Sequence, residues 1–126
     1  LTDEEWAKMS LNDYHFYTEE FVSKKMQNYL KDKDMSKVFV ITKSYTPNED
    51  ESKIYFCNKY YNIPKDHIFT VKSNEAKLDV LIKISKAFPN INPHKILMIE
   101  DTVSILNDIK ENTNFSTIHI SSFLDI

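Results

Sequence analysis

The sequence contains no glycine and no arginine, and each absence excludes classes of function. At an average usage of about 7%, a chain of this length would carry roughly nine glycines. Without glycine there is no Walker A loop, no dinucleotide-binding fingerprint and no G-x-S-x-G nucleophile elbow. All 16 basic residues are lysines, and with 19 acidic residues they give a net charge of −3. A mildly acidic chain without arginine lacks the basic face of sequence-specific nucleic-acid binders, so we expect no such binding.

Cysteine and long apolar runs are equally scarce. Cys57 is the single cysteine, which excludes an internal disulfide and a Cys-rich zinc site, and we expect it in the core. No apolar run is long enough to span a membrane, and no signal-peptide pattern opens the chain. These features favour a soluble cytoplasmic protein without a membrane partner, and they leave its oligomeric state open. The spacing of the four histidines indicates no zinc site: His15, His67, His94 and His119.

Short apolar runs alternate with helical patterns along the chain. Residues 38–41 and 96–99 are continuous apolar runs, typical of strands buried on both faces. Residues 68–71 and 117–120 are weaker strand candidates. Helical periodicity predicts four segments: one from about Thr18 to Asp32, one marked by residues 54–61 and ending before Pro64, one starting near Ser73 or Asn74, and one capped by Thr102, with Val103, Leu106 and Ile109 on its apolar face.

This alternation predicts an α/β fold. Because crossovers between parallel strands are right-handed, we expect a three-layer Rossmann-like parallel sheet with helices on both faces. The length of 126 residues fits a single domain, 1–126. Within it we expect an irregular N-terminal segment, 1–17, and an α/β core, 18–126.

Polar residues follow the predicted strands at their carboxyl ends, where ligands bind in open parallel sheets. Thr42 and Lys43 follow the first strand, and a hydroxyl with an ammonium group suits a phosphate. Lys77 lies in the helix after the second strand. Glu100 and Asp101 end the third strand, and paired carboxylates suit Mg²⁺. The sequence therefore predicts a metal-and-phosphate site.

Simpler interpretations exist for the same residues. Lys72 directly follows the second strand and is an alternative to Lys77. Glu100 and Asp101 could merely stabilise the N-terminus of the helix that starts at Thr102, because acids favour that end of a helix. His119 alternates with isoleucines, which indicates one face of an edge strand.

Three of these segments resemble motifs of the haloacid dehalogenase-like (HAD) phosphatases. Residues 38–42, VFVIT, resemble the second motif, an apolar strand ending in a phosphate-binding Thr or Ser. Lys77 is similar to the third-motif lysine, and residues 96–101, ILMIED, resemble the fourth motif with its metal-binding acids. The resemblance implies that Thr42, with Lys43 beside it, binds phosphate. It also implies that Lys77 is the catalytic charge-neutralising lysine, and that Glu100 and Asp101 hold Mg²⁺.

The first motif of that family is missing from the pattern. It is an apolar strand ending in Asp-x-Asp, whose first Asp is the nucleophile, and the family places it between the strands of the second and fourth motifs. Asp32-Lys33-Asp34 has the spacing, but the preceding residues indicate the end of a helix, so we do not assign it. Because the sequence begins with Leu1 and not Met, such a strand could lie upstream in a longer protein.

Two main functions therefore stay open. The resemblance implies a Mg²⁺-dependent phosphatase acting on a phosphate monoester, carried by a small molecule or a macromolecule. An aspartate outside this chain would attack the phosphorus in line, and water would hydrolyse the aspartyl-phosphate. The alternative is a catalytically inactive HAD-like interaction or structural module. A weaker third hypothesis is a receiver domain, because residues 95–101 also look like a receiver's opening strand, although a receiver carries that acidic pair near its start.

Overall fold

The computed structural model describes residues 22–123, and the chain divides into two compact units, Leu1–Lys72 and Ser73–Ile126. Helices and strands alternate along the described residues in the predicted order. The predicted irregular segment 1–17 lies outside the described residues. The elements are α2 Lys24–Leu30, β1 Val40–Lys43, α3 Pro47–Tyr61, β2 Ile68–Val71, α4 Ala76–Lys86, β3 Leu97–Glu100, α5 Val103–Asn112 and β4 Ser116–His119, with short 3₁₀ turns at Met35–Lys37, Lys65–His67, Pro93–Lys95 and Ile120–Phe123.

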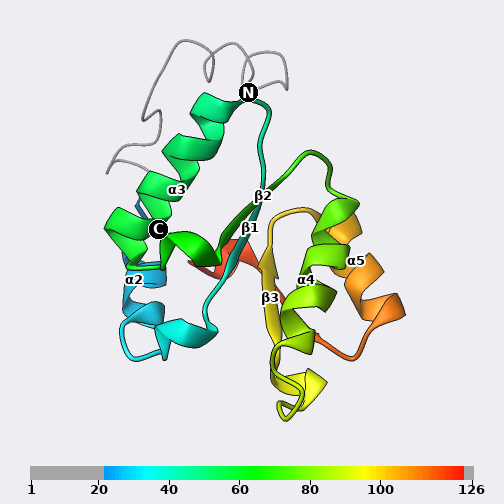
Figure 1. Ribbon diagram of the computed structural model, residues 1–126. Coiled ribbons are helices and arrows are strands. Elements are labelled where there is room, and N and C mark those ends of the chain that lie inside the picture. The colour runs from blue at the N-terminus through cyan, green and yellow to red at the C-terminus, as the bar shows by residue number, and fades with distance from the viewer. Residues whose placement is uncertain (1–21, 124–126) are drawn as a thin grey trace. The chain divides into compact units, whose positions relative to one another are not determined.

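The first unit contains a parallel pair of strands, β1 and β2. Their register runs from Val40 opposite Ile68 to Lys43 opposite Val71. Helix α3 connects the two strands and packs against β2 and against α2 (Figure 1). Buried apolar residues of this unit include Ile63, Ile68 and Val71.

Helix α3 begins earlier than the sequence pattern indicates. Thr46 is its N-cap and accepts a hydrogen bond from the main-chain N–H of Glu49 at 3.2 Å, and Pro47 occupies the first turn. A hydroxyl cap followed by proline is a typical helix start, but the polar residues after it hide the apolar periodicity. The helix ends at Asn62, whose φ of 58° is the left-handed conformation that Asn tolerates better than most residues.

The second unit contains the parallel pair β3 and β4, in register from Leu97 opposite Ser116 to Glu100 opposite His119. Helix α5 packs on both strands (Figure 1). Its buried face comprises Ile105, Leu106 and Ile109. The prediction that Val103 shares this face is wrong, because Val103 is 60% exposed. The first residue of the helix is turned away from the face that the other three define.

The described strands form two small parallel sheets, and a three-layer Rossmann-like sheet is not shown. Among residues 22–123, β1 pairs with β2 alone and β3 with β4 alone. A continuous sheet would need a strand that joins β1 to β3, and the described residues provide none. The prediction of strands buried on both faces is also wrong, since β1 is only half-buried and Leu97 of β3 is 39% exposed. A strand with one open edge lacks the neighbours that would cover it.

The helices of the described part of the chain are short. None of them combines the length and the apolar character that crossing a membrane requires.

Candidate functional site

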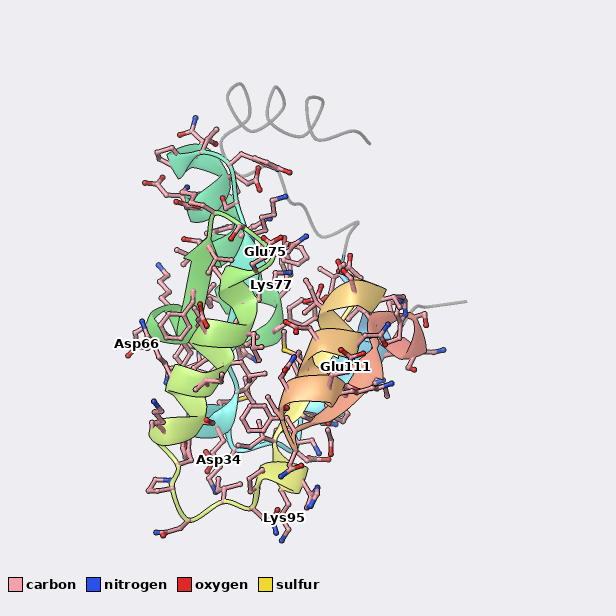
Figure 2. The ribbon with its side chains drawn as sticks, turned by 90° about the vertical axis from the view of Figure 1, so that its right-hand side faces the viewer. Asp34, Asp66, Glu75, Lys77, Lys95 and Glu111 are labelled. Atoms are coloured by element: carbon pink, nitrogen blue, oxygen red, sulfur yellow. The ribbon has the colours of Figure 1, made fainter. Side chains whose placement is uncertain are left out.

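Lys77 and Glu100 form a buried ion pair in the second unit. The Nζ of Lys77 lies 3.1 Å from Oε2 of Glu100 and 3.3 Å from Oε1. The two side chains are only 9% and 4% exposed. Lys77 lies in the first turn of α4, just after Glu75 (Figure 2), and Glu100 is the last residue of β3. The fold thus brings together two residues of the predicted site that are 23 positions apart in the sequence.

The local sequence explains why both charges are buried. Alternate residues of a strand share a face, and in β3 Met98 and Glu100 both lie on the buried one. Glu100 therefore occupies a core position and needs a cation nearby. Helix α4 supplies it. The helix begins at Ala76 with Glu75 as its N-cap, later than the predicted cap at Ser73 or Asn74, and the hydroxyl of Ser73 accepts a hydrogen bond from the N–H of Ala76 at 3.3 Å.

The two adjacent carboxyl groups differ in acidity. Burial raises the pKa of Glu100 above its usual value, a hydrogen bond with Asp101 adds to this, and the charge of Lys77 opposes it. The same hydrogen bond with Glu100 is the main reason why the pKa of Asp101 is lowered. Asp101 is also solvent-exposed, so its carboxylate is ionised at neutral pH and accessible to a ligand.

The turn between β3 and α5 is held by hydrogen bonds. The N–H of Thr102 donates to Oε1 of Glu100 at 3.3 Å, and the hydroxyl of Thr102 donates to Oδ1 of Asp101 at 3.3 Å. Thr102 is the N-cap of α5, as predicted, although no hydrogen bond links its side chain to the first turn of the helix. Glu100 takes part in this turn, which gives partial support to the simpler interpretation of the acids as helix-end residues.

His119 is a site residue that the sequence analysis missed. Its Nε2 lies 3.0 Å from the main-chain oxygen of Asp101. The parallel register places His119 opposite Glu100, at the end of the neighbouring strand. Sequence alone indicated only that this histidine lies in a strand. Only the pairing of β4 with β3 brings His119 to this turn. Strand pairing is a non-local contact, so the local sequence pattern did not reveal it.

The residues at this turn fit one Mg²⁺ ion in part. Mg²⁺ is usually bound by one or two carboxylates, with waters or substrate oxygens completing its coordination. Asp101 meets this requirement as an exposed, ionised carboxylate. Glu100 lies beside it, but both of its oxygens already accept hydrogen bonds from Lys77. Within residues 22–123 no group of three or more His, Cys, Asp or Glu side chains could hold a metal ion.

The predicted phosphate-binding residues lie in the first unit, at the carboxyl end of β1. Thr42 is opposite Thr70 in the register of the two strands. Lys43 has its ammonium group 5.1 Å from the ring centroid of Tyr45, and its main-chain carbonyl accepts a hydrogen bond from Lys53. The structure therefore brings Lys77, Glu100 and Asp101 together, and it shows Thr42 and Lys43 at the end of their own strand.

A second buried ion pair lies in α3 and was also missed. Oε1 of Glu49 is 2.9 Å from the Nζ of Lys53, and the Glu49 side chain is almost fully buried. Its other oxygen, Oε2, has no hydrogen-bond partner. The i,i+4 spacing of opposite charges after the Thr46 cap was the available signal.

Two alternative assignments of the sequence analysis can be compared with the structure. Lys72 lies 3.9 Å from Asp50 and its side chain is 70% exposed, so it forms a loose surface pair in the first unit. Asp34 follows a helix, as expected for a segment that is not the first motif. It caps the 3₁₀ turn after α2 by accepting a hydrogen bond from the N–H of Ser36 at 3.0 Å.

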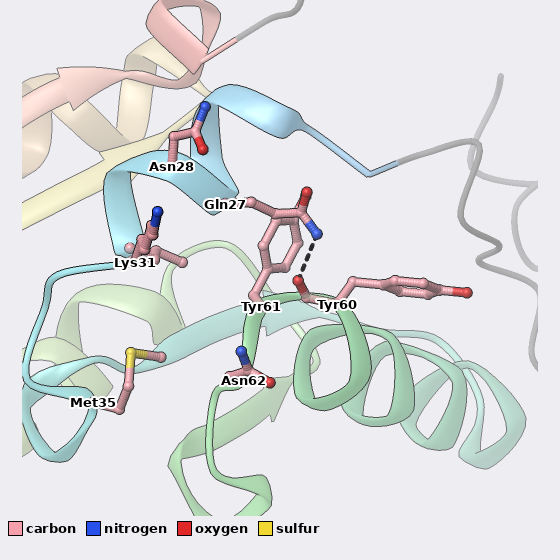
Figure 3. A pocket seen from close by; sticks show the side chains of 8 residues that line it. Gln27, Asn28, Lys31, Met35, Tyr60, Tyr61 and Asn62 are labelled. Atoms are coloured by element: carbon pink, nitrogen blue, oxygen red, sulfur yellow. Dashed lines mark hydrogen bonds between the residues drawn. The ribbon is translucent and has the colours of Figure 1, made fainter.

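A pocket of about 310 Å³ lies between α2 and the end of α3 in the first unit. The side chain of Gln27 donates a hydrogen bond to the main-chain oxygen of Tyr60 at 2.9 Å, and Figure 3 marks this bond by a dashed line. None of the residues of the predicted site line this pocket. The lining residues are Gln27, Asn28, Leu30, Lys31, Met35, Tyr60, Tyr61 and Asn62.

No family model matches the chain, and no significant match was found among curated proteins or solved structures.

Proposed function

We propose that this chain carries the metal-binding and charge-neutralising part of a HAD-like, Mg²⁺-dependent phosphatase that acts on a phosphate monoester, with the nucleophilic aspartate outside the chain. One observation carries the proposal. The residue that resembles the third motif, Lys77, contacts a residue of the segment that resembles the fourth, Glu100, at 3.1 Å. A resemblance of isolated motifs would not require these two distant positions to meet.

The chemistry of the contact fits phosphoryl transfer. Such reactions depend mostly on positioning and on neutralising the charge of the phosphoryl oxygens. Lys77 places one positive charge at the carboxyl end of a parallel strand, and Glu100 fixes its position. Asp101 would hold Mg²⁺, which would supply further positive charge to the phosphate when bound. The substrate class is a phosphate monoester on a small molecule or a macromolecule.

The strand pairing also supports a HAD-like sheet. In that family the nucleophile strand lies between the strands of the second and fourth motifs. The corresponding strands here, β1 and β3, each have a described strand partner on one side only. Each therefore has an edge to which a further parallel strand can bind, and the proposal requires one strand to use both edges.

A catalytically inactive HAD-like module is the second candidate, and a specific observation favours it. Lys77 and Thr102 already donate hydrogen bonds to Glu100, so the buried carboxylate is satisfied without a metal. A site kept for structure alone would look the same at this position.

The test is hydrolysis of p-nitrophenyl phosphate in the presence of Mg²⁺. We expect no turnover by the 126-residue chain, because neither Thr42 nor Lys77 can replace a carboxylate nucleophile. A longer gene product with an upstream Asp-x-Asp strand should show turnover, and changing its first Asp to Asn should abolish it. Measured at a temperature where circular dichroism shows both variants of that protein to be folded, Lys77→Ala should lower kcat at least about a hundredfold, whereas the matched control Lys72→Ala should leave it unchanged.

Three outcomes would contradict the proposal. Turnover by the 126-residue chain itself would show that its nucleophile lies within the sequence. Equal kcat values for the Lys77→Ala and Lys72→Ala variants would show that the buried lysine plays no part in the chemistry. A complete gene product without an upstream Asp-x-Asp strand would favour the inactive module.

A further inference from the structure

The pocket between α2 and the end of α3 lies within the first unit. Its volume of about 310 Å³ is at the lower end of the range of small-molecule sites. In Figure 3, Lys31 and Met35 lie on one side of the pocket and Tyr61 on the other, while the ring of Tyr60 points away. Among the residues of 22–123 that line the pocket, none is acidic and Lys31 is the only basic one. The lining therefore favours a small ligand with a negative charge.

Two of the lining side chains are held in place by other residues of the first unit. The hydroxyl of Tyr61 accepts a hydrogen bond from the main-chain N–H of Ser23 at 2.9 Å, and its ring packs edge-on against Phe56 with the centroids 5.7 Å apart. The amide of Gln27 donates to the main-chain oxygen of Tyr60 at 2.9 Å. Side chains that are already ordered lose little conformational freedom when a ligand binds, so this part of the pocket is preformed.

Three polar side chains of the lining are available to a ligand. Asn28, Lys31 and Asn62 are exposed, and within residues 22–123 their side chains make no hydrogen bond or ion pair. An amide is both a donor and an acceptor, and Asn and Gln pair in this way with the edge of a nucleobase. The ammonium group of Lys31 suits a phosphate, and the ring of Tyr61 offers a surface on which a base can stack.

We infer that this pocket binds a nucleoside monophosphate, with the base against Tyr61 and the phosphate on Lys31. Each part of such a ligand has a counterpart in the lining: an aromatic ring for the face of the base, amides for its edge, and an ammonium group for the phosphate. The inference does not rest on the proposed function, because the pocket lies in the first unit and the pair of Lys77 and Glu100 lies in the second.

The test is a titration of adenosine 5′-monophosphate (AMP) into the 126-residue chain, followed by two-dimensional NMR of the main-chain N–H groups. EDTA is present, so that no divalent ion takes part. We expect the shift changes to be confined to the lining residues and their neighbours in the sequence. Adenosine lacks the phosphate and should bind about fivefold more weakly than AMP. Ribose 5-phosphate lacks the base and should also bind at least about fivefold more weakly.

Two exposed residues can be changed without disturbing the packing of the unit. Lys31→Gln removes the charge, so it should raise the Kd for AMP about fivefold and leave the Kd for adenosine unchanged. Asn28→Ala removes an amide that pairs with the base, so it should raise both Kd values about fivefold. The control Lys65→Gln changes an exposed lysine of the same unit that does not line the pocket, and it should change neither Kd.

Several results would overturn the inference. One is the absence of shift changes with millimolar AMP, and another is a set of changes that lies outside the lining residues. Equal Kd values of AMP and adenosine, or of AMP for Lys31→Gln and Lys65→Gln, would show that Lys31 does not bind the phosphate. None of these results affects the proposed function, which is tested by turnover with Mg²⁺.

Discussion

Removing the charge of Lys77 should strongly destabilise the protein. At 3.1 Å, and with an effective dielectric constant of about 20, the attraction between Lys77 and Glu100 is about 5 kcal/mol. Burying both charges costs several kcal/mol for each, so the intact pair contributes little net stability. Lys77→Met keeps the length of the side chain but leaves Glu100 buried without its cation. We expect a loss of about 3–5 kcal/mol in the free energy of unfolding.

A double-mutant cycle isolates the pair. In Lys77→Met/Glu100→Gln both charges are gone, while the Gln oxygen can still accept the hydrogen bond from Thr102. We expect this double variant to lie within about 1 kcal/mol of the unaltered protein. The control is Lys72→Met, which breaks a surface pair at 3.9 Å and should cost less than about 1 kcal/mol.

Urea unfolding followed by circular dichroism measures these differences. For a chain of 126 residues, 1 kcal/mol corresponds to roughly 4 °C in melting temperature.

The pH dependence of stability gives a second readout. Burial raises the pKa of Glu100, and losing the opposing charge of Lys77 should raise it further. An acid with a raised pKa in the folded state stabilises the protein below the pKa of the unfolded chain, and this contribution is lost as the pH rises through the folded value. Lys77→Met should therefore lose more stability than the unaltered protein as the pH rises above the ordinary range of a glutamate carboxyl group.

A Lys77→Met variant as stable as Lys72→Met would contradict the dependence of the buried Glu100 on the charge of Lys77. A double variant that loses as much stability as the sum of its two single changes would also contradict it, because independent effects mean that the two side chains are not coupled.

Further predictions concern packing and reactivity. Ile109 is fully buried in the second unit, so Ile109→Ala should lower the free energy of unfolding in urea by about 2–5 kcal/mol. Val103 is exposed on the same helix, so the control Val103→Lys should change the free energy of unfolding by less than about 0.5 kcal/mol. Burial raises the pKa of the Cys57 thiol to about 11, so its thiolate fraction at about pH 8 should be about a hundredfold lower than in the unfolded chain. Ellman's reagent should therefore react slowly with the folded protein and rapidly in urea, and equal rates would contradict the raised pKa of this half-buried thiol.

The alternation of helices and strands could be predicted because it depends on local patterns. The apolar runs at residues 68–71 and 96–99 coincide with β2 and, within one residue, with β3. Helix α3 shows where such patterns fail. Its N-terminal half is polar, so apolar periodicity does not show where the helix begins. The start is marked instead by the capping hydroxyl of Thr46. Strand pairing was predicted less well, because a sheet is a set of non-local contacts and the described residues contain no strand that joins β1 to β3.

In the candidate site, too, local features could be predicted from the sequence and contacts between distant residues could not. The paired acids could be recognised because they are adjacent and end an apolar strand. The contact between Glu100 and Lys77 follows from the burial of Glu100 on the Met98 face, which the sequence did not reveal. The bond from His119 to Asp101 depends on the register of β4 against β3, and no spacing in the sequence encodes it.

The most direct test of the account is the effect of Mg²⁺ on the melting temperature of the protein and of Asp101→Asn. A ligand that binds only the folded state adds about 2.7 kcal/mol at a hundred times its Kd, which corresponds to roughly 10 °C here. Glu111→Gln, which changes another exposed acid of the same unit (Figure 2), is the matched control. We predict that Mg²⁺ raises the melting temperature of the unaltered protein and of Glu111→Gln but not that of Asp101→Asn. A melting temperature of the unaltered protein that does not change with Mg²⁺ would contradict the metal site on which the account depends.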